Sequence, residues 1–143
     1  MADFSDEFKT YLKTISTITS LVGSGINARI YSDVLKEGCL LPAIVFYERG
    51  GTSYEYLAGI GGLVRTVMHV IAYGVTRVQV NGLAETIRTK ALNTNYNGTF
   101  GSTAVTTISS SQHRVWGFDT TMDGAYRYWC ERVYDIFHAE DTS

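Results

Sequence analysis

The side chains that most often carry catalysis are sparse in this sequence and lie far apart. Its three histidines, His69, His113 and His138, have no paired spacing, and neither Cys39 nor Cys130 has a second cysteine or a histidine nearby. Zinc sites recognisable from sequence have such ligands at short, regular spacings. We therefore interpret His69 as a structural histidine and both cysteines as reduced, buried thiols. The sequence predicts neither a catalytic residue nor a metal site.

Two further patterns resemble active-site motifs at first sight. The run Gly59-Ile60-Gly61-Gly62 lacks the Lys-Ser/Thr pair of a phosphate-binding loop, and it leads into a strand instead of a helix N-terminus. Glu131 and Asp135 share one face of the last strand, an arrangement that acid–base catalysis would also need. Cross-strand pairing with Arg65 or Arg114 is the simpler interpretation. We therefore expect no cofactor and no enzymatic activity.

The composition is that of a single domain spanning residues 1–143. Hydrophobic residues make up 45% of the chain and only one proline is present, which excludes a disordered chain. The net charge of −2 and the scattered basic residues argue against a non-specific nucleic-acid binder. The longest apolar run, Leu40 to Phe46, is too short to span a membrane. The acidic N-terminus does not resemble a signal peptide, so we expect a cytoplasmic protein.

Two segments have the apolar periodicity of helices that pack on a core. An apolar stripe runs from Phe4 to Val22 at spacings of three and four residues, which predicts one helix that ends near Gly23. A second stripe, from Val80 to Ala91, predicts a helix over Arg77–Leu92. These two helices are the elements that must cover a sheet.

Runs of β-forming residues predict the strands of that sheet. The predicted strands are Ala28–Ser32, Ala43–Arg49, Leu63–Tyr73 and Ala125–His138, with a weaker one over Gln112–Met122. Residues 101–111 are rich in Ser and Thr and fit either a polar strand or a loop. The Asp123-Gly124 pair predicts a two-residue hairpin before the last strand.

The strand Leu63–Tyr73 is largely apolar on both of its faces. Such a strand needs cover on both sides, so we expect a helix of this chain on one face and a neighbouring subunit on the other. The order of elements predicts an α+β fold. Its mostly antiparallel, twisted sheet would have about four to six strands, with two helices packed on one face.

Aromatic residues are abundant where charged residues are few. The chain contains ten tyrosines, aromatic residues amount to 13%, and charged residues to 18%. Tyrosine and tryptophan contribute strongly to contacts between proteins, whereas charged residues are depleted from interface cores. This balance favours a protein that assembles with other proteins over an enzyme.

Several segments are notable for their order and spacing along the chain. They are Ala28-Arg29-Ile30-Tyr31-Ser32-Asp33, Leu41-Pro42-Ala43-Ile44-Val45-Phe46-Tyr47-Glu48, the helix Val80–Leu92, Tyr96-Asn97-Gly98 and Arg132-Val133-Tyr134-Asp135-Ile136. No segment is diagnostic alone, and together they cover most of the chain. In this order and spacing they resemble the tail completion or tail terminator proteins of long-tailed bacteriophages.

The resemblance implies a structural virion protein that forms a hexameric ring on the head-proximal end of the tail tube. Such a ring stops polymerisation of the tube and provides the joining surface for the head. Its implied partners are other copies of the chain, the tail tube protein and a head–tail connector or neck protein. Genomic DNA would pass through the lumen without specific binding, and no membrane is involved. The implied location is the virion, reached by assembly in the host cytoplasm.

Two sets of residues are the predicted protein contacts. The loop Gly51–Gly62 combines glycines with aromatic residues and is expected to face the tube or the connector, unless it folds back on its own domain. The residues expected to make that contact are Tyr54, Glu55, Tyr56 and Leu57. The residues expected between subunits are Arg65, Val67, His69 and Ile71.

Two other functions remain open at this point. A head–tail adaptor or another neck protein would have a similar composition and similar contacts. A small cytoplasmic ligand-binding module or an enzyme would need a well-formed apolar pocket with converging polar groups.

Overall fold

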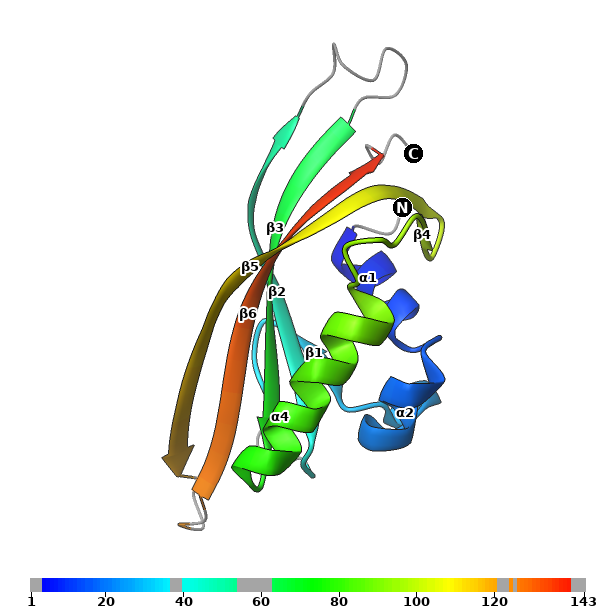
Figure 1. Ribbon diagram of the computed structural model, residues 1–143. Helices are drawn as coiled ribbons and strands as arrows, with labels where there is room; N and C mark the ends of the chain where they lie inside the picture. Colours follow the sequence, from blue (N-terminus) through cyan, green and yellow to red (C-terminus); the bar gives the residue numbers. More distant parts are fainter. Residues whose placement is uncertain (1–3, 37–39, 54–62, 121–123, 125, 140–143) are drawn as a thin grey trace.

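A six-stranded, twisted sheet forms the frame of the protein. The computed structural model describes residues 4–36, 40–53, 63–120, 124 and 126–139 (Figure 1). The strands are β1 (Ile30–Ser32), β2 (Ala43–Ser53), β3 (Leu63–Gly74), β4 (Gly98–Phe100), β5 (Thr103–Thr120) and β6 (Tyr126–Ala139). They lie in the order β1-β2-β3-β6-β5-β4, and every pair except the parallel β1–β2 is antiparallel.

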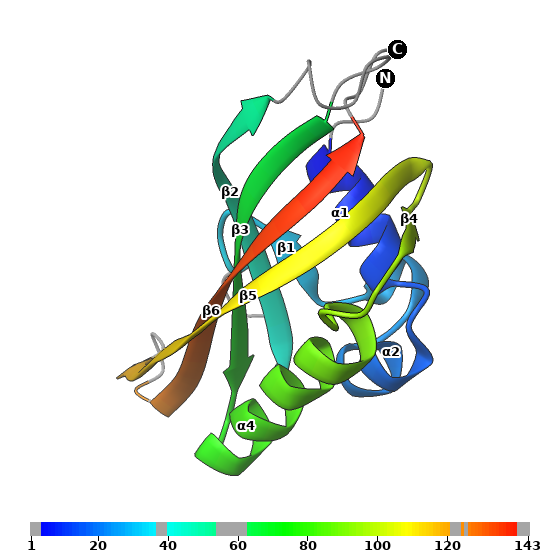
Figure 2. The same cartoon turned by 45° about the horizontal axis from the view of Figure 1, so that its top comes forward.

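The helices all lie on the same side of this sheet (Figure 1, Figure 2). They are α1 (Phe4–Leu12), α2 (Ser16–Val22) and α4 (Arg77–Thr86). The 3₁₀ turn η1 (Gly25–Asn27) follows α2, and the π-helical turn η2 (Ile87–Ala91) continues the end of α4. The predicted α+β fold, with a mostly antiparallel sheet and its helices on one face, is therefore confirmed. The described helices number three instead of two because the first predicted helix is divided.

The division of the first helix occurs after Leu12. Ile15 has the extended backbone of an N-cap, with φ −90° and ψ 107°. The Thr14 hydroxyl donates a hydrogen bond to the Tyr11 carbonyl at 2.6 Å. Threonine side chains that bond nearby backbone groups compete with the helical ladder. The apolar stripe continues across this break because α2 packs on the same core, and so periodicity alone could not reveal it.

The second half of the sheet contains one long strand where two segments were considered separately. The Ser/Thr-rich stretch and the weak strand after it form β5, which is irregular between Ser110 and Arg114. Thr120 and Tyr126 are the last described pair of β5 and β6. The predicted two-residue hairpin at Asp123-Gly124 falls largely outside the described residues, of which only Gly124 lies in this turn.

An aromatic cluster joins α1 to the sheet and to η2, which continues α4. The Phe8 ring packs edge-on against Phe46 at 5.0 Å, and the Tyr11 ring stacks on Phe100 at 4.1 Å. The Tyr11 hydroxyl donates a 2.6 Å hydrogen bond to the Ala91 carbonyl in η2. Burial raises the pKa of Tyr11 well above its usual range, which keeps this hydroxyl protonated as a donor.

His138 anchors the start of α1 near the end of β6. Its imidazole stacks flat on the Phe4 ring at 3.8 Å, and its side chain is only 4% exposed. Nδ1 donates to the Ala139 carbonyl at 2.8 Å, so in the neutral ring Nε2 accepts from the Thr66 hydroxyl at 2.7 Å. Burial lowers the pKa of His138, because the charged ring would lose its hydration.

The lowered pKa of His138 predicts that acid destabilises the fold. An unfolded histidine has a pKa of about 6.5, so the unfolded chain binds more protons than the folded chain once the pH falls below that value. The free energy of unfolding should therefore decrease as the pH falls from about 7 to about 5, and urea unfolding at each pH measures it. His138→Gln should flatten this slope. An equally steep slope in His138→Gln would assign the acid sensitivity to other groups.

Candidate functional site: the helix-free face of the sheet

The four predicted subunit-contact residues lie together on the face of the sheet that carries no described helix. Along β3, the residues at the helix side, Thr66, Met68, Val70 and Ala72, are at most 4% exposed. Arg65, Val67, His69 and Ile71 alternate with them and are half-buried, on the opposite side. We call the surface on this side the helix-free face. Figure 2 shows that the helices gather on the other side.

Neighbouring strands extend this surface with further apolar side chains. Across β3 and β6, Tyr73 stands opposite Trp129, His69 opposite Val133 and Arg65 opposite Phe137. On the other side of β3, Val45 stands opposite Ile71. The apolar and aromatic side chains of the helix-free face are Val45, Tyr47, Val67, Ile71, Tyr73, Trp129, Val133 and Phe137.

The charged groups of the helix-free face are joined in pairs across adjacent strands. Arg65 contacts Asp135 at 3.0 Å between β3 and β6, which confirms the predicted cross-strand pairing. Arg127 donates two hydrogen bonds to the Asp119 carboxylate, at 2.9 and 2.8 Å, and its guanidinium lies 5.4 Å from the centre of the Tyr73 ring. Partly exposed ion pairs add at most about 1 kcal/mol to stability. Both arginines and both aspartates are therefore paired within the helix-free face.

His69, Glu131 and Tyr47 form the third charged cluster. His69 Nδ1 lies 2.6 Å from Glu131 Oε2, and the Tyr47 hydroxyl donates to the same oxygen at 3.3 Å. The Tyr47 ring stacks on the imidazole at 4.6 Å. Burial, followed by the Glu131 carboxylate, raises the pKa of Tyr47. A carboxylate also orients a catalytic histidine, but here the same oxygen accepts from Tyr47, whose ring covers one face of the imidazole.

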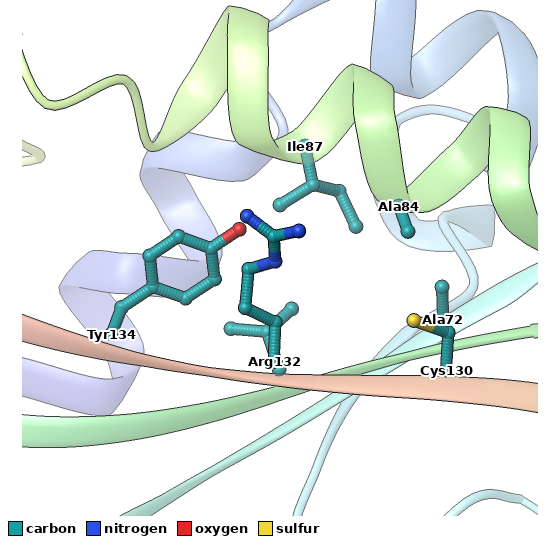
Figure 3. A pocket seen from close by; sticks show the side chains of 7 residues that line it. Ala72, Ala84, Ile87, Cys130, Arg132 and Tyr134 are labelled. Atoms are coloured by element: carbon teal, nitrogen blue, oxygen red, sulfur yellow. The ribbon is translucent and has the colours of Figure 1, made fainter. Parts of the chain in front are cut away.

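A small cavity lies between the sheet and α4. Figure 3 shows the Arg132 guanidinium beside the Tyr134 hydroxyl, below Ile87, with Cys130 on the opposite wall. Cys130 is a buried thiol, as predicted. Burial raises the pKa of Tyr134 to about 12, and the charge of Arg132 opposes this rise. The volume of about 10 Å³ suits one water molecule, whereas ligand pockets measure roughly 300–1,000 Å³.

Several predicted residues lie outside the described part of the chain. Tyr54, Glu55, Tyr56 and Leu57, the proposed contacts of the glycine-containing loop, belong to this group. Cys39 does as well. Sequence reasoning missed Gly117 and Trp129, whose relation is cross-strand and has no local signal in either segment.

Comparison with known proteins adds no relative from which a function could be transferred. No protein-family model matches the chain, and no curated protein matches it. Among the described residues, no helix is long and apolar enough to cross a membrane. In the same part of the chain, no group of three or more His, Cys, Asp or Glu side chains is placed to hold a metal ion. The surfaces of the molecule are therefore the features from which its function is inferred.

Gly117 allows Trp129 to lie flat on the helix-free face. The two residues pair directly between β5 and β6. A Cβ atom added at Gly117 would lie closer to the indole ring than Cβ atoms lie to their neighbours in proteins. The ring therefore occupies the space that any other residue at position 117 would need. Trp129 in turn extends the apolar row that begins at Tyr73.

Gly117→Ala should displace the Trp129 ring and destabilise the fold by about 1–3 kcal/mol, the usual effect of overpacking. Urea unfolding measures the free energy, and tryptophan fluorescence reports the altered surroundings of the indole. Ser109→Ala, an exposed change on the same strand, is the control and should leave both unchanged. An unaltered spectrum in Gly117→Ala would contradict the contact.

Proposed function

We propose that this chain is a structural assembly protein that acts as a phage tail terminator. Copies of it would form a hexameric ring on the head-proximal end of the tail tube, stop tube polymerisation and provide the joining surface for the head. The observation that carries the proposal is the helix-free face, with its apolar rows and its charges already paired. The order of the sequence segments that resemble tail completion proteins supports the same function.

Exposure of the helix-free face to water is unfavourable in free energy. A sheet with one face in water normally places polar residues there, but Val67, Ile71 and Val133 stand on the exposed side. Burial of apolar surface contributes roughly 25 cal/mol per Å². Because the arginine and carboxylate groups are already paired within the chain, a partner can cover this face without separating charges.

Ring formation supplies a defined end to an assembly. A head-to-tail contact between identical chains closes into a ring when the rotation between copies permits it, and otherwise grows into a filament. A terminator needs one end of its ring to match the last ring of the tube and the other end to differ. A hexamer would carry a formal charge six times the −2 of one chain, which suits a lumen that DNA crosses without adhering.

Ile71→Asp tests the helix-free face as a contact between copies. A carboxylate buried at an interface without a partner is strongly unfavourable, so the variant should be monomeric at concentrations where the wild type has a mass near six times 15.8 kDa. Native mass spectrometry across a concentration series measures this change. Thr89→Asp, an exposed change on the helix side, should assemble normally. Assembly of Ile71→Asp into a normal ring would remove the face from the contact.

Deletion of residues 54–58, which keeps Thr52 and Ser53 of β2 for their pairing with β3, tests the proposed tube-facing loop. The shortened chain should still form the ring but should no longer stop growth of purified tail tube protein, because the aromatic residues proposed to contact the tube are removed. Electron microscopy of tube lengths, with and without the added protein, measures capping. Normal capping by the shortened chain would end the proposal for this loop. Failure of the full chain to cap tubes would overturn the terminator function itself.

A further inference from the structure

An uncharged groove lies between α2 and α4, on the helix side of the molecule. Leu21 of α2 and Pro42 line it, and α4 contributes the apolar Val78 and Leu83, the backbone of Gly82, and the uncharged polar side chains of Gln79 and Thr86. Its volume is about 270 Å³, enough to receive a large side chain, unlike the one-water cavity under α4. Val78 is 81% exposed at its rim. A groove of this composition favours an apolar or aromatic occupant over a charged one.

Gly82 is the unexpected residue of this groove. It lies in the interior of α4, where glycine is among the least favourable residues for a helix. A Cβ atom added there would meet nothing within 4 Å, so packing within the described part of the chain gives no reason for glycine. Gly82 follows Val78 by four residues and therefore shares its helix face. The bare backbone at this point lets another molecule approach the helix closely.

An exposed aromatic pair lies on the opposite flank of α4. Phe118 near the end of β5 is 63% exposed and Tyr126 at the start of β6 is 59% exposed. Their rings meet edge to face at 5.8 Å and form a projecting unit that we call the aromatic knob. Figure 1 and Figure 2 both place the β5–β6 hairpin and α2 on opposite sides of α4. The knob of one chain therefore cannot reach its own groove.

We infer that the aromatic knob of one copy seats in the α2–α4 groove of the next copy. An uncharged groove with exposed backbone matches an uncharged aromatic pair on the same chain. Two different patches on opposite flanks make a heterologous contact, the kind that a ring of more than two copies requires. The inference rests on the proposed ring for the identity of the partner, and it names surfaces beyond the helix-free face.

Gly82→Gln is the decisive substitution, because it should improve the helix while filling the groove. Glutamine is a better helix former than glycine, so the melting temperature of the dilute chain should rise. The same side chain should weaken self-association by about tenfold or more, as loss of a central contact does. Phe118→Ser should weaken self-association similarly. Asn81→Gln, at the adjacent exposed position, is the matched control and should assemble like the wild type.

Directed cross-linking identifies which surfaces meet. In a Cys39→Ser background, one batch of chain carries Gly82→Cys and a second carries Phe118→Cys. A heterologous contact should give a disulfide dimer when the batches are mixed under mild oxidation, and neither batch should cross-link alone. Cross-linking of the Phe118→Cys batch by itself would indicate a symmetric contact between knobs and would overturn the inference.

The outcomes separate this inference from the proposed function. A wild-type ring whose mass is unchanged by Gly82→Gln overturns the inference and leaves the terminator function standing. A chain that stays monomeric to its solubility limit and gives no mixed cross-link also overturns it, whether or not it caps tubes. A ring that Gly82→Gln dissociates, but that fails to cap tubes, supports the inference and overturns the terminator function.

Discussion

The placement of every described helix on one side of a two-sided apolar sheet is the constraint on which the rest of this molecule depends. β3 presents buried residues such as Met68 and Val70 to the helices, and its alternate residues to the helix-free face. Side chains alternate strictly along a strand, so the chain has no means of turning both apolar rows towards the same layer. One layer of helices completes one core, and no described helix covers the second row. The proposed function is an account of what covers that row.

Stacked aromatic rings hold the first helix of this layer against the sheet. Aromatic stacking connects α1 to β4 through Tyr11 and Phe100, and the His138 imidazole holds Phe4 against the sheet. Such contacts depend on ring orientation as well as on burial, which gives the short helix α1 a defined position. The polar atoms involved find partners within the chain, as the Tyr11 hydroxyl does with Ala91. The described helices therefore form a single layer on one side of the sheet.

The two sides of the sheet carry different kinds of surface. The helix-free face combines apolar rows with ion pairs between neighbouring strands, whereas the helix side carries a groove and a projecting hairpin on either flank of α4. Two unlike patches on opposite flanks suit head-to-tail association, and a broad flat face suits a partner that covers many strands. The proposals of assembly and of the knob-in-groove contact therefore use different surfaces of one fold.

The sequence by itself determined the α+β class, the two apolar rows of β3 and the placement of Arg65, Val67, His69 and Ile71 on a common face, because periodicity and β propensity are local properties. It also indicated the Arg65–Asp135 pairing as one of two choices. The tertiary structure alone decided the break after Leu12, the single long β5, the seat of Trp129 on Gly117 and the groove at Gly82. The break accompanies a local hydrogen bond of Thr14 that the apolar periodicity does not register. The other three depend on strand register and helix packing, which bring separate segments together and which no local pattern encodes.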